Sequence, residues 1–397
     1  MTVAKVRDFI LGLAQILLRS LPWPAKTGLI RVGNPGRDAP VLITCNYNLT
    51  VRRVLRALRG LDVYLLVAPT KGINVWCGAA GGYFTAHQVI SILRTSGIGE
   101  LVDHRRLILP QLSATGIERK LVEQRTGWRV VFGPVYASDI PAYLAENRKT
   151  EAMRQVRFGL SDRLEMAAVW AFPFSMIGGG VLAIDWRQLL LPFVAMTWAL
   201  ALGLYVFLPW LSGTVDATRH PQATWVRYLI LFDPRLRWNS IVWLLFLAAL
   251  CGQAYVRGAL HVRSLAGWSL ASLFVMLFIS MDLAGSTPVY KSGLHEDRLL
   301  HVDLNTEACK GRAMCREVCP KNCYVIDAVA HKAAIAMPDA CVQCGACIVQ
   351  CPEDALAFVT PAGERIPPEV IRTYKLNLLG ARARSIADEG RSISDRS

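Results

Sequence analysis

Short apolar runs separated by turn residues recur through the first 160 residues of the chain. Pro40–Cys45 and Val63–Val67 have the length and composition of buried strands, and Leu107–Leu109 and Arg129–Phe132 are each followed by a turn that contains proline. The segment Val51–Leu58 is expected to be a helix. This alternation predicts an α/β domain with an open, mostly parallel sheet and helices on both faces.

Longer apolar runs follow between residues 166 and 283. Met166–Ile184, Leu189–Leu211, Ile241–Val256 and Leu265–Leu283 contain 19, 23, 16 and 19 residues. About 20 apolar residues are needed to cross the hydrocarbon core of a bilayer. Buried helices of a soluble protein are the alternative, but four such runs in succession favour a transmembrane bundle of four helices.

The net charge of +14 comes from 44 basic and 30 acidic residues, and many of the arginines flank the apolar runs. This placement indicates a membrane surface and membrane lipid as a partner, and it argues against nucleic acid. Arginines are more frequent before the first run and between the second and third than in the loops on the opposite side. By the positive-inside rule we expect a multi-pass protein of the cell inner membrane with both soluble domains in the cytoplasm.

Eight of the 11 cysteines lie between Cys309 and Cys351. The order Cys341-x2-Cys344-x2-Cys347-x3-Cys351-Pro352 is the bacterial ferredoxin run, in which three cysteines hold one cluster and the fourth reaches the other. A zinc site needs only paired cysteines and does not explain the Cys-Pro ends. We therefore expect a bacterial-type, two-cluster ferredoxin domain (α+β) and a low-potential electron donor as its partner.

The first half of this ferredoxin pattern is incomplete, because Arg312 stands where the second ligand belongs. One [4Fe–4S] cluster is expected on Cys341, Cys344, Cys347 and Cys319. The other cluster is expected on Cys309, Cys315 and Cys351, without its usual fourth ligand. The segment CREVCPKNCY resembles seven-iron ferredoxins, in which a similar gap gives a [3Fe–4S] cluster. Cys323 is either a free thiol beside a cluster or a substitute ligand that restores a second [4Fe–4S] cluster.

These patterns divide the chain into five segments. Residues 1–30 contain an amphipathic N-terminal helix, residues 31–163 the α/β domain, residues 164–285 the transmembrane domain, residues 299–362 the ferredoxin domain, and residues 363–397 a C-terminal tail.

The most unusual stretch of the α/β domain is Thr70–Phe84, TKGINVWCGAAGGYF, which follows the expected strand at Val63–Val67. Its glycines permit close approach of the backbone to a flat ligand. Cys77 is a single cysteine at the expected start of a helix. Residue types alone favour a buried structural cysteine over a functional thiol, since free cysteine is among the most buried residues.

This stretch resembles the cap-helix motif N-V-W-C-A-A-G-K of the mercury-methylation corrinoid protein family (HgcA type), which is related to the large subunit of the corrinoid iron–sulfur protein. VLITCNYNLT, HRRLILPQL and VVFGPVYASDIPAYL resemble that family too, so residues 32–164 are covered. The resemblance implies a Rossmann-like domain that binds a cobalamin-type corrinoid, with Cys77 as the catalytic lower ligand of the cobalt. It also implies that Asn74 and Trp76 shape the cap and that Asn46 and Thr50 contact the corrin.

The family also has a membrane bundle, and its partner (HgcB type) is a two-cluster ferredoxin, so this chain resembles the two proteins fused. Two departures count against mercury as the methyl acceptor. Gly78, Ala80 and Gly81 replace Ala, Gly and Lys of the motif, and no cysteine follows Pro352, where the partner family carries a terminal cysteine pair.

The sequence thus predicts a membrane-bound, corrinoid-dependent methyltransferase whose fused ferredoxin reduces the cobalt centre, with a methyl-donor protein or a pterin cofactor as a further partner. Two alternatives stay open. One is a mercury methyltransferase, and the other is a membrane iron–sulfur electron carrier without a corrinoid.

Overall fold

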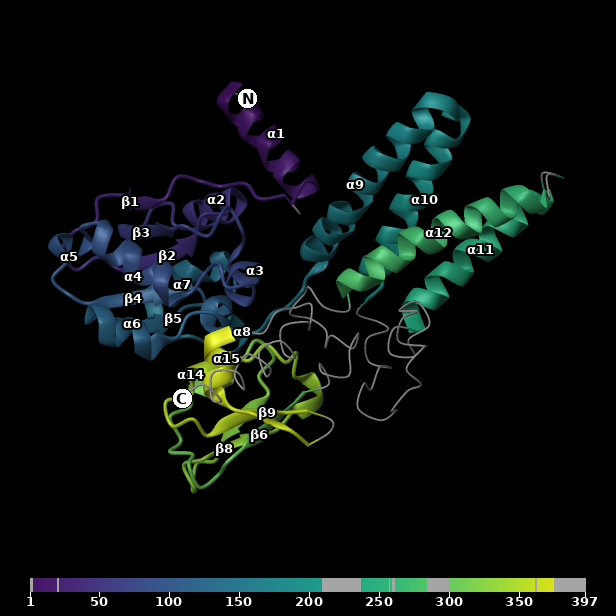
Figure 1. Cartoon of the computed structure of the whole chain (residues 1–397). Coiled ribbons are helices and arrows are strands. Elements are labelled where there is room, and N and C mark those ends of the chain that lie inside the picture. Colours follow the sequence, from purple (N-terminus) through teal and green to yellow (C-terminus); the bar gives the residue numbers. More distant parts are fainter. Residues whose placement is uncertain are drawn as a thin grey trace, which may run out of the picture. The chain divides into compact units, whose positions relative to one another are not determined.

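The computed structural model describes residues 3–19, 21–208, 237–256, 258, 261–283, 300–360 and 363–374 (Figure 1). The chain divides into two compact units. One consists of residues 22–156 together with 295–397, and the other of residues 1–21 together with 157–294. The α/β and ferredoxin parts therefore belong to one unit although residues 157–294 separate them in the sequence.

The α/β part is built on a five-stranded sheet with the order β1-β3-β2-β4-β5. The strands are β1 (Gly28–Val32), β2 (Val41–Cys45), β3 (Val63–Ala68), β4 (Arg106–Leu109) and β5 (Arg129–Phe132). The pairs β2–β3, β2–β4 and β4–β5 are parallel, and β1 is antiparallel to β3. The sequence pattern located the four parallel strands to within one residue at each end and missed the antiparallel edge strand β1.

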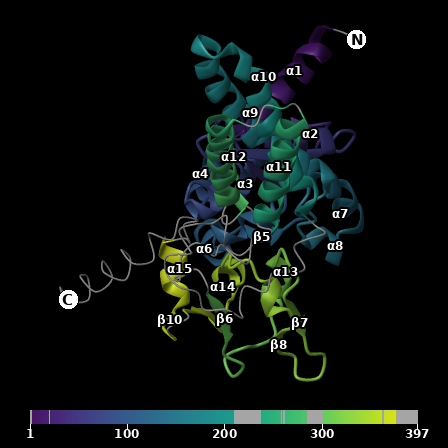
Figure 2. The same cartoon turned by 90° about the vertical axis from the view of Figure 1, so that its right-hand side faces the viewer.

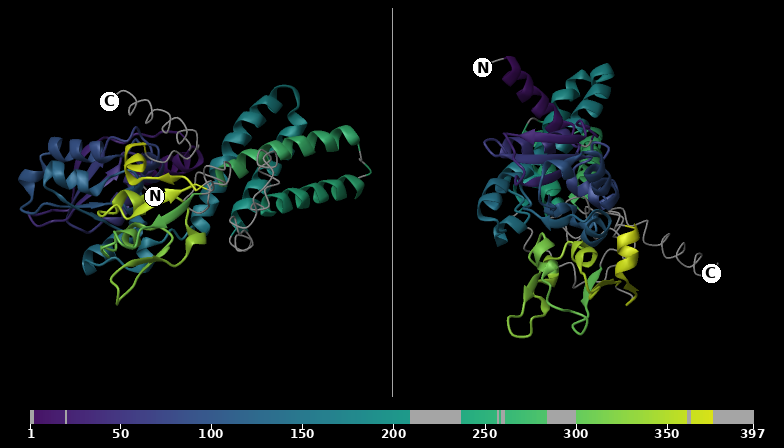
Figure 3. Two further views of the ribbon diagram at one scale, coloured as in Figure 1. Left: turned by 60° about the horizontal axis from the view of Figure 1, so that its bottom comes forward. Right: turned by 90° about the vertical axis from the view of Figure 1, so that its left-hand side faces the viewer.

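Helices cover both faces of this sheet (Figures 1 and 3). Leu65 and Val67 of β3 pack with Val51 and Val54 of α2 (Asn48–Ala57) in one cluster of buried residues, to which α7 (Ile140–Glu146) also contributes. On the other side lie α4 (Ala86–Thr95), which contacts β3, and α6 (Arg119–Thr126), which contacts β5. The remaining short elements are α3 (Val75–Ala80), α5 (Ile98–Leu101), η1 (Gln111–Thr115), η2 (Ala137–Asp139) and α8 (Glu151–Arg154).

Strand β2 lies between β3 and β4, so the chain order reverses beside it. In open α/β sheets, ligands bind outside the carboxyl ends of the strands, next to such a reversal. Asn46 follows β2, the segment 69–74 follows β3, and η1 follows β4. This carboxyl edge is therefore where the fold favours a ligand site.

The second unit contains α1 (Val3–Leu17), α9 (Leu160–Asp185), α10 (Arg187–Val206), α11 (Arg237–Val256) and α12 (Val262–Leu283). Helices α9 to α12 are long and apolar enough to cross a membrane. Leu200, Leu204 and Tyr205 are buried among these helices, whereas Ile177 and Leu191 are 72% and 77% exposed. Large exposed apolar side chains on apolar helices are what contact with lipid requires. Residues 209–211, the end of the second expected span, lie outside the described part of the chain.

The ferredoxin part consists of two similar halves, each with a five-residue helix (Figure 2). Its elements are β6 (His301–Leu304), α13 (Met314–Val318), β7 (Tyr324–Ile326), β8 (Ala333–Ile335), η9 (Pro338–Ala340), α14 (Ala346–Gln350), β9 (Leu356–Val359), β10 (Arg365–Ile366) and α15 (Pro368–Tyr374). Strands β10, β9 and β6 form one antiparallel sheet, and β7 and β8 form another. Ile371 of α15 is buried in the core of this part, so the domain continues past residue 362.

Candidate functional site

Asn46, at the end of β2, holds the segment that follows β3. Its side chain is 5% exposed, and its Oδ1 accepts hydrogen bonds from the backbone N–H of Thr70 at 2.9 Å and of Gly72 at 2.8 Å. The Thr70 hydroxyl also donates to Oδ1 at 2.9 Å. Asn46 therefore fixes the segment that leads to α3 (Val75–Ala80), which we call the cap helix. Its polar atoms bond within the protein, so direct contact with a corrin stays a prediction for this residue.

The same segment ends at Asn74, which directs both polar ends of its side chain at Cys77. Its Oδ1 accepts from the Cys77 N–H at 2.9 Å and so caps helix α3, and its Nδ2 donates to the Cys77 sulfur at 3.4 Å. Cys77 is half-buried. The hydrogen bond from Asn74 fixes the position of this sulfur. The resemblance to the cap-helix motif assigned both residues to one site, and in the structure they are joined by two hydrogen bonds.

Helix α3 lies directly against the segment that follows β4. A Cβ built on Gly116 would lie 2.7 Å from Cα of Ala79, and one built on Gly78 would lie 3.3 Å from Cβ of Phe84. Only glycine permits so close an approach at position 116. The sequence analysis did not select Gly116, because nothing in its neighbourhood resembles a turn motif for this contact.

Two buried polar atoms in these elements have no hydrogen-bond partner. They are Nε1 of Trp76, a residue that is 9% exposed, and Oγ1 of Thr115. An unpaired buried donor costs about 1–3 kcal/mol. A corrin ring carries amide groups around its rim, which offer such partners, and a cysteine thiolate is a soft ligand suited to a transition metal. The residues present therefore fit a corrinoid.

Thr50 lies in α2 and bonds the buried thiol of Cys45, whose pKa is raised by its burial.

Tyr83 and Lys71 flank the cap helix and were not expected. Tyr83 is 40% exposed, the Nζ atom of Lys71 lies 5.1 Å from the centre of its ring, and a Cβ on Gly81 would lie 3.3 Å from that ring. Lys71 thus brings a cation close to position 81, where the resembling family has lysine. In the sequence, only the position of Tyr83 directly after Gly81 and Gly82 pointed to this arrangement.

The ferredoxin cysteines line two separate cavities. One is lined by Cys309, Cys315 and Cys351, with Arg312 at the same wall. The other is lined by Cys319, Cys341, Cys344 and Cys347, and also by Cys323. We call them the three-thiol cavity and the five-thiol cavity. Apart from Cys323, the three cysteines of one cavity and the four of the other are the two groups expected for two clusters.

Helices α13 and α14 each serve both cavities. Cys315 and Cys347 lie in the helices, and Cys319 and Cys351 follow their last residues. Each helix begins after a residue in the left-handed conformation, Ala313 with φ 60° and Gly345 with φ 72°. This repeated geometry lets one short helix contribute a thiol to each of the two clusters.

Cys323 lies in the five-thiol cavity, 2% exposed, and its N–H donates to the Cys319 sulfur at 3.3 Å. That cavity already holds four thiols in the expected ligand set. The geometry therefore favours a free thiol beside the cluster over a substitute for the ligand missing at position 312. The Arg312 side chain is 67% exposed and pairs with Glu353 at 3.5 Å.

The thiols lie in surroundings that suit clusters. The Tyr324 hydroxyl donates to the Cys347 sulfur at 3.0 Å, and the Ala333 N–H donates to the Cys309 sulfur at 3.4 Å. Burial raises the pKa of Cys315 to about 11, so a free thiolate is disfavoured without positive charge from iron. Within the described residues, no three or more His, Cys, Asp or Glu side chains converge on a single ion.

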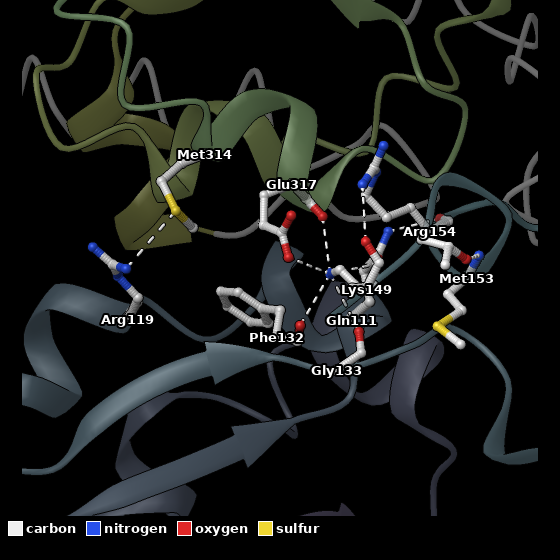
Figure 4. Close-up of polar contacts among 10 residues, drawn as sticks. Gln111, Arg119, Phe132, Gly133, Lys149, Met153, Arg154, Met314 and Glu317 are labelled. Atoms are coloured by element: carbon white, nitrogen blue, oxygen red, sulfur yellow. Dashed lines mark hydrogen bonds and ion pairs between the residues drawn. The ribbon is translucent and has the colours of Figure 1, made fainter. Parts of the chain in front are cut away.

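Lys149 joins the α/β part to the ferredoxin part (Figure 4). Its Nζ donates to Oε1 of Gln111 and to the carbonyl oxygens of Phe132 and Glu317, each at 3.0 Å, and lies 2.8 Å from Oε1 of Glu317. Burial lowers the Lys149 pKa to about 8, although the Glu317 carboxylate opposes that shift. The two soluble parts thus share a buried polar contact.

Comparison with known proteins matches both soluble parts. Residues 18–144 match the family model of the CO dehydrogenase/acetyl-CoA synthase delta subunit, and residues 334–357 match the 4Fe-4S binding domain. The chain therefore carries a domain similar to that subunit family and a 4Fe–4S ferredoxin domain.

Similar proteins include gamma subunits of the acetyl-CoA decarbonylase/synthase complex. The subunit of Archaeoglobus fulgidus is 38% identical over 128 residues, 32% of this chain and 27% of that protein. The subunit of Methanopyrus kandleri is 36% identical over 125 residues, 31% of this chain and 27% of that protein. The chain thus spans about a quarter of the length of these curated relatives. The residues that match the subunit family model, 18–144, include the whole five-stranded sheet and end before α9.

Proposed function

We propose that this protein is a membrane-bound, corrinoid-dependent methyltransferase with a built-in electron supply. The observation that carries the proposal is the pair of hydrogen bonds between Asn74 and Cys77, one donated by each residue, which holds a half-buried thiol at the carboxyl edge of the sheet. The similarity of residues 18–144 to an acetyl-CoA synthase subunit family supports it. A bound corrinoid would supply a cobalt centre able to accept and release a methyl group.

The residues of the chain have distinct tasks in this proposal. Cys77 would hold the cobalt of a bound corrinoid through its sulfur, and Asn74 orients that sulfur. Asn46 keeps the preceding segment in place. Trp76 offers its free indole N–H to an acceptor on the corrin rim. A thiolate ligand adds more electron density to the metal than a neutral nitrogen ligand, which favours an electrophilic methyl acceptor.

The ferredoxin part would hold a [4Fe–4S] cluster in the five-thiol cavity and a [3Fe–4S] cluster in the three-thiol cavity, with a second [4Fe–4S] cluster as the alternative. A low-potential donor would reduce these clusters, and a methyl-donor protein or a pterin would supply the methyl group. Helices α9 to α12 would anchor the protein in the inner membrane with both soluble parts in the cytoplasm, and membrane lipid would contact their exposed apolar side chains.

A mercury methyltransferase is the second candidate. Lys71 beside Tyr83 restores a cation near position 81 and favours it. The lack of a terminal cysteine pair counts against it, so we place another acceptor first. Incubating the methylated protein with mercury(II) and with other electrophilic acceptors, followed by product analysis, separates the two candidates.

Variants at Cys77 test the proposal. The purified wild-type protein should show a corrinoid absorbance in addition to that of the clusters, and a protein without corrinoid would instead support the electron-carrier alternative. Cys77→Ala should shift the corrinoid spectrum, weaken its binding and abolish most methyl transfer. Cys77→His should retain more corrinoid than Cys77→Ala, because it keeps a ligand. Cys251→Ala, which alters an exposed cysteine of α11, is the control.

Asn74→Asp sharpens the test, because it keeps the acceptor that caps α3 and replaces the N–H donor near the sulfur with a carboxylate. The corrinoid spectrum should shift as in Cys77→Ala, although the helix persists. If Cys77→Ala retained the wild-type spectrum and full activity, the thiol would be a packing residue and the proposal would be rejected.

A further inference from the structure

One buried side chain connects the ferredoxin part to the segment under the cap helix. Gln350, the last residue of α14, is 5% exposed. Its Nε2 donates to the carbonyl oxygens of Ala114 at 2.7 Å and of Ile117 at 2.6 Å. Its Oε1 accepts from the N–H of Arg119 at 3.2 Å. Both donors and the acceptor of the amide are used, so its orientation is fixed.

The segment that Gln350 grips is also the one that α3 contacts. Gly116 lies between the two carbonyl groups bound by Gln350, and its backbone packs against Ala79, two residues after Cys77. A single turn of chain therefore touches both the ferredoxin part and the helix that carries the proposed cobalt ligand.

On the ferredoxin side, Gln350 precedes Cys351, a thiol of the three-thiol cavity. The path from Cys351 to the cap helix thus consists of one peptide bond, the Gln350 side chain, one hydrogen bond to Ile117, the backbone from Ile117 to Gly116, and one close contact with Ala79. A second contact of the same segment also leads to this cavity, because Arg119 donates to Sδ of Met314, which lines it, at 3.8 Å. Two further contacts lie apart from Gln350: Asn322 donates to Glu151 of α8, and Glu317 binds Lys149, which also donates to Gln111 at the start of η1. The three-thiol cavity is therefore the cavity most directly coupled to α3.

We propose that Gln350 is a positioning residue for electron delivery, and that the cluster of the three-thiol cavity is the immediate electron donor to the corrinoid. This inference rests on the proposed function. In the step, the reduced cluster loses one electron and the cobalt gains it, passing from the divalent to the monovalent state, without transfer of a proton or a group. A low-potential one-electron donor then restores the cluster by way of the five-thiol cavity.

The first experiment examines docking in the full-length protein in detergent. Gln350→Met removes all three hydrogen bonds at similar length, and Gln350→Glu keeps the acceptor for Arg119 but turns a carboxylate towards two carbonyl oxygens. Gln124→Met, on the exposed side of α6, is the control. Both Gln350 variants should show faster hydrogen exchange at residues 114–119 than wild type, with iron content and paramagnetic cluster signals unchanged.

The second experiment measures electron arrival. After flash photoreduction of the clusters, the absorbance change of cobalt reduction should be slower in both Gln350 variants by about tenfold or more, since small misplacements of reacting groups cost rates of this order. Methyl uptake by protein whose cobalt was chemically reduced beforehand should match wild type. A merely structural role would lower both rates together.

The outcomes separate the two claims. Wild-type cobalt reduction rates in both Gln350 variants, with corrinoid bound, would overturn the role of Gln350 and leave the proposed function standing. A wild-type protein that binds no corrinoid would overturn both. If Gln350→Met lost its clusters, Gln350→Glu would decide, because it retains one of the three bonds.

Discussion

The Nζ atom of Lys149 lies 2.8 Å from Oε1 of Glu317, a residue 168 positions further along the chain. The Lys149 side chain is 3% exposed, whereas that of Glu317 is 38% exposed, so the cation is the more buried partner. Glu317 lies in α13 between Cys315 and Cys319. The contact therefore attaches α13, which contributes a cysteine to each of the two cavities, to the carboxyl edge of the α/β sheet.

Breaking this pair should weaken the soluble unit. Lys149→Met leaves several buried carbonyl oxygens without their donor, and an unsatisfied buried polar group costs about 1–3 kcal/mol. Denaturant unfolding, followed by the visible absorbance of the clusters, should show the loss. Lys120→Met, which changes an exposed lysine of α6, should unfold like wild type. Equal stability of Lys149→Met and wild type would show that the contact contributes nothing.

The same lysine predicts a pH dependence. Its pKa is about 8 in the folded protein against a reference value of 10.5, so between these values the unfolded chain binds more protons than the folded chain. The stability that Lys149 contributes should rise with pH across that window and be lowest below pH 8, where the buried group is charged. Relative to Lys149→Met, the gain should not exceed about 3 kcal/mol, at roughly 1.4 kcal/mol per pKa unit. A stability difference that fell between pH 8 and 10 would contradict the assignment.

The two cavities predict the iron content. The three-thiol cavity should give the paramagnetic signal of an oxidised [3Fe–4S] cluster, and about seven irons per chain follow from the ligand count. Cys323→Ser should leave this signal unchanged, because Cys323 lies in the five-thiol cavity. Arg312→Cys should raise the iron content towards eight. Eight irons in wild type, reduced by Cys323→Ser, would make Cys323 a ligand after all.

The close contact of α3 predicts the effect of a single methyl group. Gly116→Ala places a Cβ against the Ala79 backbone, and such overpacking costs about 1–3 kcal/mol. Corrinoid affinity should fall with stability, because α3 must move away. Gly36→Ala, where nothing lies within 4 Å of the added carbon, is the matched control. Unchanged affinity in Gly116→Ala would separate the cap helix from the binding site.

Membrane topology can be tested with reporters fused after Val156, Asp185, Val256 and Tyr374. The arginine distribution predicts cytoplasmic signals at the first and last positions and periplasmic signals at the two between them. A cytoplasmic signal after Asp185 would mean that α9 does not cross.

Periodicity and length were sufficient to place most elements. The strands at Val41–Cys45 and Arg129–Phe132 were located because buried parallel strands are continuous apolar runs bounded by turn residues. The edge strand Gly28–Val32 was missed, since the arginine at its exposed position interrupts the apolar run. Helix α2 begins at Asn48, three residues before the apolar run that predicted it, because polar residues can fill the first turn of a helix.

The candidate site was only partly accessible to sequence reasoning. Spacing alone predicted which of the seven cysteines line each cavity, because ligand geometry fixes the spacing, and their role as cluster ligands stays a prediction. The contacts of Gln350 and Lys149 join residues more than 150 positions apart, and no local pattern encodes such pairs. The bonds of Asn46 to the 70–72 segment likewise depend on β2 and β3 being neighbours, which the sequence suggests but does not position to the atom.

The contact between the α/β part and the ferredoxin part also limits how many times the chain between them can cross a membrane. Residues 157–294 leave the soluble unit and return to it, while Lys149 and Glu317 bond across the gap. If α9 to α12 cross a bilayer, as we propose, a chain that must end on its starting side can cross only an even number of times. An odd count would separate the two residues by a hydrocarbon layer of roughly 30 Å and leave Lys149 buried without its counter-charge. On this proposal, Lys149 and Glu317 can meet only when an even number of the helices between them has crossed the bilayer. Folding of the unit that contains both residues therefore depends on correct insertion of those helices.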